Sequence, residues 1–208
     1  MQLSPLQLDY NYVSFDNNLN SAKFYKKNDQ RKGSITGTTA KISDSNFTQG
    51  KKKGANPMNI QSLASVSAAQ YELLLSTDPS PVMVASYVNR ALKFAAQIDH
   101  KLVGVLLLLP THPQTLEIVN LAVSQCHQNQ GIGTQLLQFA ENWAHQKHYR
   151  TLEIAPGSTS FGPLYLYQKQ GFRITSIERD FFSRHYPQTI WENKLILKDL
   201  IRLQKTLQ

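Results

Sequence analysis

From residue 58 onward, apolar and polar positions follow the spacing of helices and of strands in turn. Residues 68–75 and 81–93 carry apolar side chains at helical spacing. The second stretch opens with Pro81 after Ser80. This is typical of a helix start, because a serine oxygen accepts from the first turn and proline fits the first helical position. The pattern therefore predicts two consecutive helices.

Apolar runs in the middle of the chain predict the strands of a sheet. Residues 94–98 and 103–109 flank a short polar turn and predict a hairpin, whose second strand is apolar on both faces, as a central strand is. Residues 115–123 and 151–155 predict two further strands. Between these two, residues 131–147 carry a broad apolar stripe at a period of about 3.6, which predicts a long amphipathic helix.

The C-terminal part of the chain predicts both kinds of element. We expect a short helix over residues 162–170, strands over residues 172–182 and 189–197, and a terminal helix over residues 199–207. Helices and strands alternate along the chain, so the predicted fold class is α/β.

Residues 1–57 differ in character from the rest. They are rich in Asn, Ser, Thr, Lys, Gly and Gln, and no apolar period persists in them for more than a few positions. Such a segment buries too little surface to offset the entropy of ordering. We therefore expect a polar, poorly ordered N-terminal extension, in which residues 10–15 alternate well enough to allow one short strand. A single domain is expected over residues 58–208.

Length and composition narrow the class of protein. The chain has 208 residues, of which 41% are hydrophobic, enough for one good core. No apolar run approaches the roughly 20 residues of a membrane-spanning helix, and no targeting segment is evident, so a soluble, cytoplasmic protein is expected. Cys126 is the single cysteine, which excludes an intramolecular disulfide and a cysteine-built zinc site. The histidines have no ligand spacing, and no metal is expected.

The net charge of +8 raises the question of nucleic-acid binding. Residues 1–57 hold 9 of the 22 Lys and Arg but only 4 of the 14 Asp and Glu, so most of the excess lies in the extension. Its densest piece, residues 51–53, is too short for a nucleic-acid stripe, and no reader motif accompanies it. Nucleic acid is therefore not the expected partner, and a solvated basic tail is the plainer interpretation.

The stretch from Leu121 to Leu137 carries the most chemical information. An apolar strand leads into a polar turn, and Gly131 and Gly133 open the long helix. A helix start exposes unpaired backbone N–H groups and the positive end of the helix dipole, which together suit a phosphate group. Glycines at a helix start also serve plain turns, so this pattern alone leaves phosphate binding undecided.

Two familiar phosphate motifs are not satisfied by this loop. No Gly-Lys-Ser/Thr follows it, which excludes a Walker-type nucleotide site. No third glycine stands three residues after Gly133, so the dinucleotide-binding fingerprint is incomplete.

The chain resembles the GNAT family of N-acetyltransferases. The family's loop reads Gln/Arg-x-x-Gly-x-Gly/Ala, and residues 128–133 read QNQGIG. About thirty residues later, residues 166–172 read LYQKQGF, which is similar to the family's LYxKxGF element. Order, separation and flanking elements agree over residues 60–200. The resemblance implies a mixed, mostly antiparallel central sheet flanked by helices and splayed between its fourth and fifth strands.

The resemblance also implies acetyl-coenzyme A as the acetyl donor and indicates the residues that hold it. The backbone of the fourth strand would pair with the pantetheine arm, and the backbone of the loop would wrap the pyrophosphate. Where the family often has an asparagine after the fifth strand, this chain has a serine, whose shorter hydroxyl would need a bridging water. The expected cofactor-binding residues are Leu121, Ala122, Val123, Gln128, Asn129, Gln130, Gly131, Ile132, Gly133, Thr134, Ser158 and Ser160.

The family's mechanism is direct transfer, in which a neutral amine attacks the thioester carbonyl. Tyr167 occupies the tyrosine position of LYxKxGF and is the expected general acid, because a phenol stays protonated at neutral pH. A core tyrosine is the structural alternative. Glu117, on the predicted fourth strand with the parity of Leu121 and Val123, is the expected general base. A structural salt bridge at Glu117 is an equally open interpretation, and Glu153 is a weaker candidate.

The C-terminal segment is similar to a bacterial subgroup of the family that carries DFF, HYP and EN in this order. In that interpretation His185, Tyr186 and Glu192 would face the acceptor, whereas a plain hairpin with a proline turn is the structural alternative. Few acidic residues are expected along the acceptor segments, which argues against a polycationic substrate.

The predicted function is acetyl transfer to a primary amine, carried by a small molecule or a peptide. A catalytically silent acyl-coenzyme A-binding module of the same fold is the main alternative. The sequence indicates no membrane partner, and it leaves a homodimer and the identity of the acceptor open.

Overall fold

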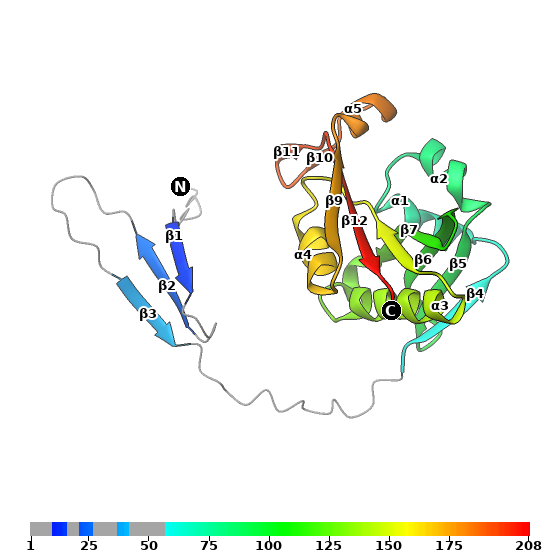
Figure 1. Cartoon of the computed structure of the whole chain (residues 1–208), viewed down its shortest axis with the longest axis horizontal. Helices are drawn as coiled ribbons and strands as arrows, with labels where there is room; N and C mark the ends of the chain where they lie inside the picture. Colours follow the sequence, from blue (N-terminus) through cyan, green and yellow to red (C-terminus); the bar gives the residue numbers. More distant parts are fainter. Residues whose placement is uncertain (1–9, 16–20, 27–36, 42–56) are drawn as a thin grey trace, which may run out of the picture. The chain divides into compact units, whose positions relative to one another are not determined.

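A computed structural model describes residues 10–15, 21–26, 37–41 and 57–208. The chain forms two compact units, Met1–Ala55 and Asn56–Gln208. In the first unit, three strands pair antiparallel in the order β1-β2-β3 (Figure 1). Their bounds are Tyr10–Phe15, Ser21–Lys26 and Gly37–Lys41.

Strand β1 coincides with the short strand that the sequence allowed. Strands β2 and β3 were not predicted, because no persistent apolar alternation marks them in the sequence. The other residues up to 56 lie outside the described residues, so the lack of order expected for them stays a prediction.

The second unit is built on a seven-stranded sheet in the order β4-β5-β6-β7-β8-β12-β9 (Figure 1). Strands β7 and β8 pair in parallel, and the other neighbours in this sheet pair antiparallel, as the resemblance implied. The bounds are β4 Asn59–Leu63, β5 Leu92–Ile98, β6 Lys101–His112, β7 Thr115–Val123, β8 Thr151–Ile154, β9 Arg173–Glu178 and β12 Leu200–Thr206.

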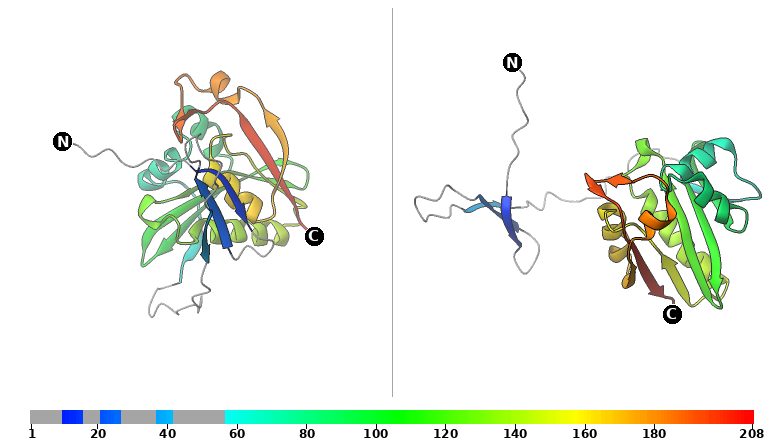
Figure 2. Two further views of the ribbon diagram at one scale, coloured as in Figure 1. Left: turned by 90° about the vertical axis from the view of Figure 1, so that its left-hand side faces the viewer. Right: turned by 90° about the horizontal axis from the view of Figure 1, so that it is seen from above.

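Helices cover both faces of the sheet (Figures 1 and 2). Leu106 and Leu108 of β6 belong to the main hydrophobic cluster under α3 and α4, whereas Val105 and Leu107 belong to a second cluster under α1 and α2. This division follows from the alternation of side chains along a strand, and it explains why β6 reads as continuously apolar. The helix bounds are α1 Ala68–Leu75, α2 Pro81–Val88, α3 Ile132–Gln146, α4 Phe161–Lys169 and α5 Phe181–His185.

The first two helices begin at the predicted residues, Ala68 and Pro81, and the capping residues that predicted the second are in place. Ser80 caps α2 and accepts from the Met83 N–H at 3.3 Å, with Pro81 in the first turn. Helix α2 ends at Val88 rather than at residue 93, because the residues from Leu92 on form β5. Strand β4 was missed entirely.

The sheet splays between β7 and β8. The two strands pair only from Thr115 opposite Thr151 to Ile118 opposite Ile154, where β8 ends. Strand β7 continues to Val123 along β6, with a register shift that leaves Val119 without a partner residue. A bulge of this kind bends a strand, and it lies where the two strands separate.

Three C-terminal predictions differ from the structure, in one case only at the end of the element. The strand predicted over residues 172–182 ends at Glu178, and α5 follows after Asp180, whose φ is 56°. The strand predicted over residues 189–197 is a small hairpin, with β10 at Trp191–Glu192 and β11 at Leu195–Ile196.

The predicted terminal helix is strand β12, inserted between β8 and β9. Ile201, Leu203 and Leu207 share one parity and pack with the main cluster, while Leu200 points to the other face and lines a cavity. Apolar side chains on both faces of this strand imitate helical spacing, which is the physical reason for the error. In the described part of the chain, no helix has the length and apolar character needed to cross a membrane.

Candidate active site

The glycine turn opens α3 as the sequence predicts. Gly131 is the N-cap residue and has φ 82°, a conformation that strains any residue with a Cβ. The first helical hydrogen bond runs from the Gln135 N–H to the Gly131 carbonyl at 3.1 Å. The N–H groups of Ile132, Gly133 and Thr134 precede it, and no side chain of the described residues caps them. The turn therefore presents a row of backbone donors at the positive end of a helix of 15 residues.

Amide side chains brace the turn from within. The Gln128 side chain donates to the Val123 carbonyl at 3.1 Å, and the Gln130 side chain donates to the Cys126 carbonyl at 3.0 Å. Asn129 takes a positive φ of 58°. Gln128 and Gln130 thus hold the loop in shape.

Gly133 also allows close packing of α3 against α4. A Cβ added at Gly133 would lie 3.3 Å from Leu166 Cδ2, tighter than ordinary contact. The LYQKQGF element, which contains Leu166, and the glycine turn are therefore neighbours in space as well as parts of one sequence pattern.

The end of β7 lies beside the gap in the sheet. Ala122 is fully buried, and Leu121 and Val123 are half-buried against the main cluster. Val119 instead packs with the cluster under α1 and α2, because the bulge changes the face of the strand. The shared parity of Glu117 with Leu121 and Val123 therefore does not place the three side chains on one face.

A cavity of about 620 Å³ occupies the region where β7 and β8 separate. Its lining comes from the α1–α2 connection, α2, β7, the end of β8, α4, α5, the β10–β11 hairpin and β12. Among the predicted site residues, Glu117, Leu121, Ser160 and Tyr167 line this cavity. The side chains of the glycine turn, Ala122, Val123 and Ser158 are outside its lining.

Tyr167 lies on α4 and reaches the cavity from the side of the main cluster. Its ring packs against Phe172 at 6.2 Å between centroids, and 7% of the residue is exposed. Burial raises the pKa of the Tyr167 hydroxyl above its ordinary value, because the charged phenolate is poorly solvated there. The hydroxyl is thus held in its protonated form beside the cavity.

Glu117 lies opposite Glu153 in the parallel pair of strands, and Glu153 accepts from the Gln204 side chain at 2.6 Å. Burial raises the pKa of the Glu117 carboxyl, Arg202 and His112 oppose this shift, and the Glu153 charge reinforces it. Arg202 Nη1 stands 3.8 Å from Glu117 Oε1. Both expectations for Glu117 therefore have support, since it lines the cavity and also forms an ion pair.

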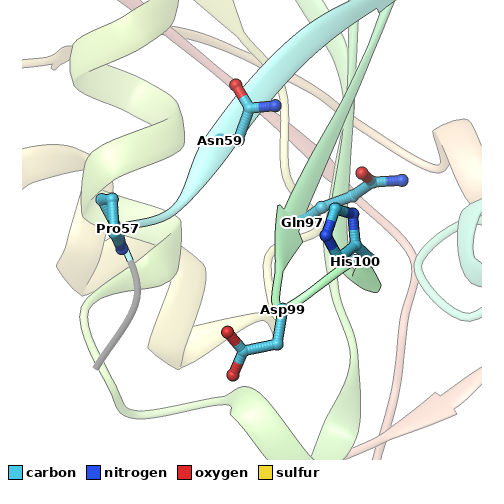
Figure 3. A pocket seen from close by; sticks show the side chains of 5 residues that line it. All are labelled: Pro57, Asn59, Gln97, Asp99 and His100. Carbon is cyan, nitrogen blue, oxygen red and sulfur yellow. The ribbon is translucent and has the colours of Figure 1, made fainter. Parts of the chain in front are cut away.

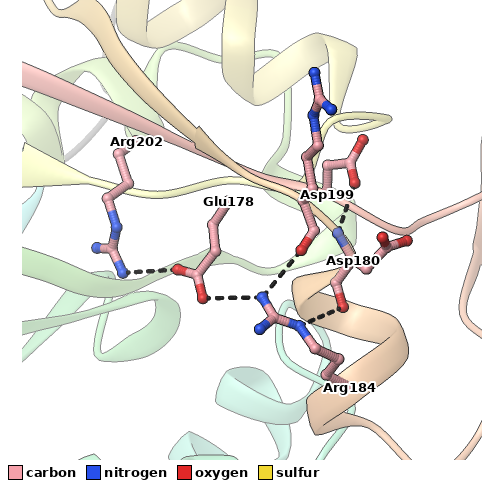
Figure 4. A network of polar contacts seen from close by, with 6 residues as sticks. Glu178, Asp180, Arg184, Asp199 and Arg202 are labelled. Atoms are coloured by element: carbon pink, nitrogen blue, oxygen red, sulfur yellow. Dashed lines mark hydrogen bonds and ion pairs between the residues drawn. The ribbon is translucent and has the colours of Figure 1, made fainter.

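Arg202 belongs to a chain of charges that reaches α5 (Figure 4). Its Nη2 is 3.5 Å from Glu178, and Glu178 is 3.4 Å from Arg184 of α5. Arg184 also donates to the Asp180 carbonyl at 3.4 Å, and the Asp180 N–H donates to Asp199 at 2.8 Å. The contacts join α5 to β9 and to the start of β12.

A buried polar network on the other wall of the cavity was not predicted. Asp78 accepts from the hydroxyls of Tyr186 at 3.0 Å and Tyr87 at 3.1 Å. Asn120 donates to the Tyr87 hydroxyl at 3.0 Å and accepts from Thr77 at 3.0 Å. Burial raises the pKa of both tyrosines and Asp78 adds to this effect, whereas the hydrogen bond from Asn120 lowers the pKa of Tyr87. Tyr186 was expected near the acceptor from the HYP pattern, but no local signal marks Asp78.

The EN dipeptide docks the small hairpin onto the loop after β8. Glu192 accepts from the hydroxyls of Thr159 at 2.9 Å and Ser160 at 2.7 Å, and Asn193 donates to the Thr159 carbonyl at 2.7 Å. Glu192 also lines the cavity, so the hairpin and the acceptor-facing interpretations are compatible. Ser158 donates its backbone N–H to the Asp199 carbonyl at 2.8 Å.

A second hollow of about 380 Å³ shares no residue with this cavity (Figure 3). It lies at the turn between β5 and β6 and at the start of β4, and it is lined by Pro57, Asn59, Gln97, Asp99 and His100. It lies on elements that carry none of the predicted site residues. Among the described residues, no group of three or more His, Cys, Asp or Glu could hold a metal ion.

Comparison with known proteins agrees with this fold. The sequence matches the model of the acetyltransferase (GNAT) family over residues 62–172. The uncharacterized N-acetyltransferase YvbK of Bacillus subtilis (strain 168) is 45% identical over 133 residues, which are 64% of this chain and 86% of that protein.

Solved structures with similar sequences share the architecture. The IAA acetyltransferase from Bacillus cereus ATCC 14579 is 41% identical with a TM-score of 0.69, and the match covers 73% of this chain and 100% of that one. A GNAT family acetyltransferase from Elizabethkingia anophelis, with acetyl-CoA bound, is 40% identical with a TM-score of 0.69 and coverage of 72% and 98%. An acetyltransferase of Bacillus subtilis in complex with CoA is 41% identical with a TM-score of 0.70 and coverage of 73% and 100%.

The splayed sheet, the glycine turn and these matches define an acyltransferase fold. The chain belongs to the GNAT family of acetyltransferases.

Proposed function

We propose that this chain transfers the acetyl group of acetyl-CoA directly to a primary amine. The observation that carries the proposal is the splay of the sheet beside the uncapped start of α3. Similar structures that are at least 40% identical contain CoA or acetyl-CoA. The catalytic domain of this proposal spans residues 58–208.

In this proposal the chain binds the donor mainly through its backbone. The N–H groups of Ile132, Gly133 and Thr134 receive the pyrophosphate, since the loop from Gln128 to Thr134 has no Lys or Arg. Beyond Ile118, β7 has no partner strand on the side of β8, so its backbone there pairs with the pantetheine arm.

The chemistry moves two protons and exchanges two bonds. The neutral amine nitrogen attacks the thioester carbonyl carbon, the new C–N bond forms, and the C–S bond breaks. Glu117 takes the proton that the amine nitrogen loses, directly or through a water. Tyr167 gives a proton to the departing sulfur and recovers one from the solvent, to which Glu117 releases the proton that it took. A backbone N–H of β7 stabilises the oxygen that becomes negative during the attack.

Replacing Tyr167 by Phe tests this assignment. The buried ring and its packing against Phe172 are kept, and only the hydroxyl is lost. We expect kcat to fall by about 10²-fold, since general acid catalysis typically contributes that much or more. The dissociation constant of acetyl-CoA, measured by calorimetry, should stay within about twofold of the parent value.

Tyr165→Phe is the matched control, because Tyr165 lies on the same helix and is exposed. It should leave kcat unchanged. A catalytically silent acyl-CoA-binding module would bind acetyl-CoA and acetylate no member of an amine panel analysed by mass spectrometry, and this result would contradict the proposed activity.

A further inference from the structure

The cavity between β7 and β8 carries an excess of negative charge. Asp78, Glu117 and Glu192 contribute carboxylates to its lining, whereas Arg202 is the one cation among the described residues that line it. This corrects the expectation that few acidic residues line the acceptor segments.

The charge of Arg202 is already compensated within the protein. Its guanidinium lies between Glu117 at 3.8 Å and Glu178 at 3.5 Å, and Glu178 is shared with Arg184. A substrate carboxylate would have to compete with both glutamates for this one cation. Among the described residues that line the cavity, there is therefore no uncommitted positive group for an acidic substrate.

Neutral groups, and no cation among the described residues, donate the hydrogen bonds that the carboxylates of Asp78 and Glu192 accept. Asp78 accepts from two tyrosine hydroxyls and from the Ser80 N–H at 3.2 Å. Glu192 accepts from two hydroxyls of the loop after β8. Such bonds hold a carboxylate in place without adding positive charge, so the potential inside the cavity stays negative.

Apolar and aromatic side chains form much of the remaining wall on the acceptor side. They come from α2, α5 and the segment that leads into the hairpin, namely Met83, Phe181, Phe182, Tyr186, Ile190 and Trp191. Aromatic faces attract cations and also pack against flat apolar groups. The wall suits an apolar or aromatic skeleton.

We propose that the acetyl acceptor is a cationic amine on an apolar or aromatic skeleton that carries no carboxylate or phosphate. This inference rests on the proposed acetyltransferase function. An amine that arrives protonated is attracted by the negative cavity, whereas an α-carboxylate beside the same amine meets like charges.

Pairs of amines that differ only by a carboxylate test the inference with the full chain. Tyramine with tyrosine, tryptamine with tryptophan, and histamine with histidine are compared for kcat/KM with acetyl-CoA. We expect each amine to be preferred over its amino acid by about tenfold or more, since like charges at close range are strongly disfavoured.

Charge-removing variants keep the test specific to the cavity. Asp78→Asn and Glu192→Gln preserve shape, and each should raise KM for the amines and narrow the preference over the amino acids. Glu72→Gln is the matched control, because Glu72 is exposed on α1 and does not line the cavity. Glu72→Gln should change neither the KM for the amines nor their preference over the amino acids.

The outcomes separate this inference from the proposed function. Acetylation of the amino acids at equal or higher kcat/KM would overturn the inference and leave the acetyltransferase function standing. A preference that Asp78→Asn and Glu192→Gln leave intact would also overturn it. No acetylation of any amine, with acetyl-CoA bound normally, would overturn the proposed function and this inference with it.

A second, independent observation concerns β9, the edge strand of the sheet. Arg173 to Ile177 are all exposed, and Ile174 and Ile177 expose 49% and 58% of their surface. An edge strand with exposed isoleucines presents unpaired backbone groups to another chain.

The six residues of β9, RITSIE, are complementary to themselves when two copies run antiparallel. Arg173 then faces Glu178 of the second copy, Ile174 faces Ile177, and Thr175 faces Ser176. Ile174 and Ile177 lie on one face although they are three positions apart, because the register between β9 and β12 shifts at Thr175; they pair with Leu203 and Ile201 on one side of β12. Arg173 and Glu178 pair with Gln204 and Leu200 on the other side.

We infer that two copies of this chain pair through β9 about a twofold axis between Thr175 and Ser176, which makes one continuous sheet. On one face of this sheet, Ile174 of each copy would pack against Ile177 of the other copy. On the opposite face, Arg173 of each copy would pair with Glu178 of the other.

Sedimentation velocity over a range of protein concentrations tests this pairing. We expect a dimer for the full chain and a shift toward monomer for Ile177→Lys. Ile196→Lys, at an isoleucine of the β10–β11 hairpin that is 41% exposed, is the matched control and should leave the dimer intact. A monomer at every concentration up to ~100 μM, the micromolar range in which specific complexes form, would overturn the inference. A dimer that Ile177→Lys leaves unchanged would do the same.

Discussion

At the scale of single residues, the cavity joins groups that are far apart in the sequence. Asp78 and Tyr186 are 108 positions apart, and Thr77 and Asn120 are 43 apart. Neither pair follows from periodicity or from a short motif. Its position in LYQKQGF singled out Tyr167, which lines the cavity, whereas Asp78 became visible only through the fold.

Asn120 is the buried centre of that network, with 6% of its surface exposed. It donates to the Tyr87 hydroxyl and to the Leu74 carbonyl, and it accepts from Thr77. Asn120→Ala leaves these partners unsatisfied, and we expect a loss of about 2–4 kcal/mol in the free energy of unfolding. Urea titration measures it. Gln61→Ala, at an exposed position of β4, should cost less than about 0.5 kcal/mol, and an equally small loss at Asn120 would contradict the role given to the network.

The ionisation of Glu117 predicts how activity depends on pH. Burial raises the pKa of its carboxyl above the ordinary value of 4.5, and the Arg202 cation lowers it. A general base works in its deprotonated form, so kcat/KM should fall as the pH drops through this pKa. Arg202→Gln removes the cation that favours the carboxylate, so the acid limb should move to higher pH.

The matched control is Lys205→Gln, since Lys205 pairs with Glu141 at 2.6 Å and lies outside the cavity lining. Its acid limb should coincide with that of the parent protein. If Arg202→Gln also leaves the limb in place, then Glu117 is not the group that limits the rate at low pH.

At the scale of elements, the sequence was most informative where one face of an element is buried. Helix α3 has a clear one-sided pattern and was predicted within one residue of its observed bounds. Strand β7, which is packed on both faces, was predicted at its observed bounds from its apolar run. Strand β12 has apolar side chains on two faces, and β9 is exposed on both, so neither shows a clean period of two. The splay itself follows from the early end of β8 and the bulge at Val119, which no local pattern marks.

The start of α3 allows a test with two glycines in different conformations. Gly131 has φ 82°, so Gly131→Ala should cost about 1 kcal/mol or more of folding free energy and weaken acetyl-CoA binding. Gly162 lies within α4, and a Cβ there meets nothing within 4 Å. Gly162→Ala should be neutral or gain up to about 1 kcal/mol. Thermal unfolding and calorimetry with acetyl-CoA compare the two, and equal effects would mean that the turn imposes no special conformation.

At the scale of the whole molecule, the two compact units divide the chain near residue 55. The site residues all belong to Asn56–Gln208, and the family match begins at residue 62. The second unit contains both hydrophobic clusters and the seven-stranded sheet. Folding and acetyl transfer should therefore need only this unit.

A chain that begins at Met58 tests whether the second unit alone is sufficient for folding and acetyl transfer. We expect its kcat/KM for a good amine acceptor to stay within about twofold of the full chain, because the removed residues supply none of the groups assigned to the reaction. The truncation also removes nine of the basic and four of the acidic side chains, so nonspecific binding to DNA should weaken and lose some of its salt dependence. A much lower kcat/KM with unchanged thermal unfolding would show instead that the N-terminal unit takes part in binding the acceptor.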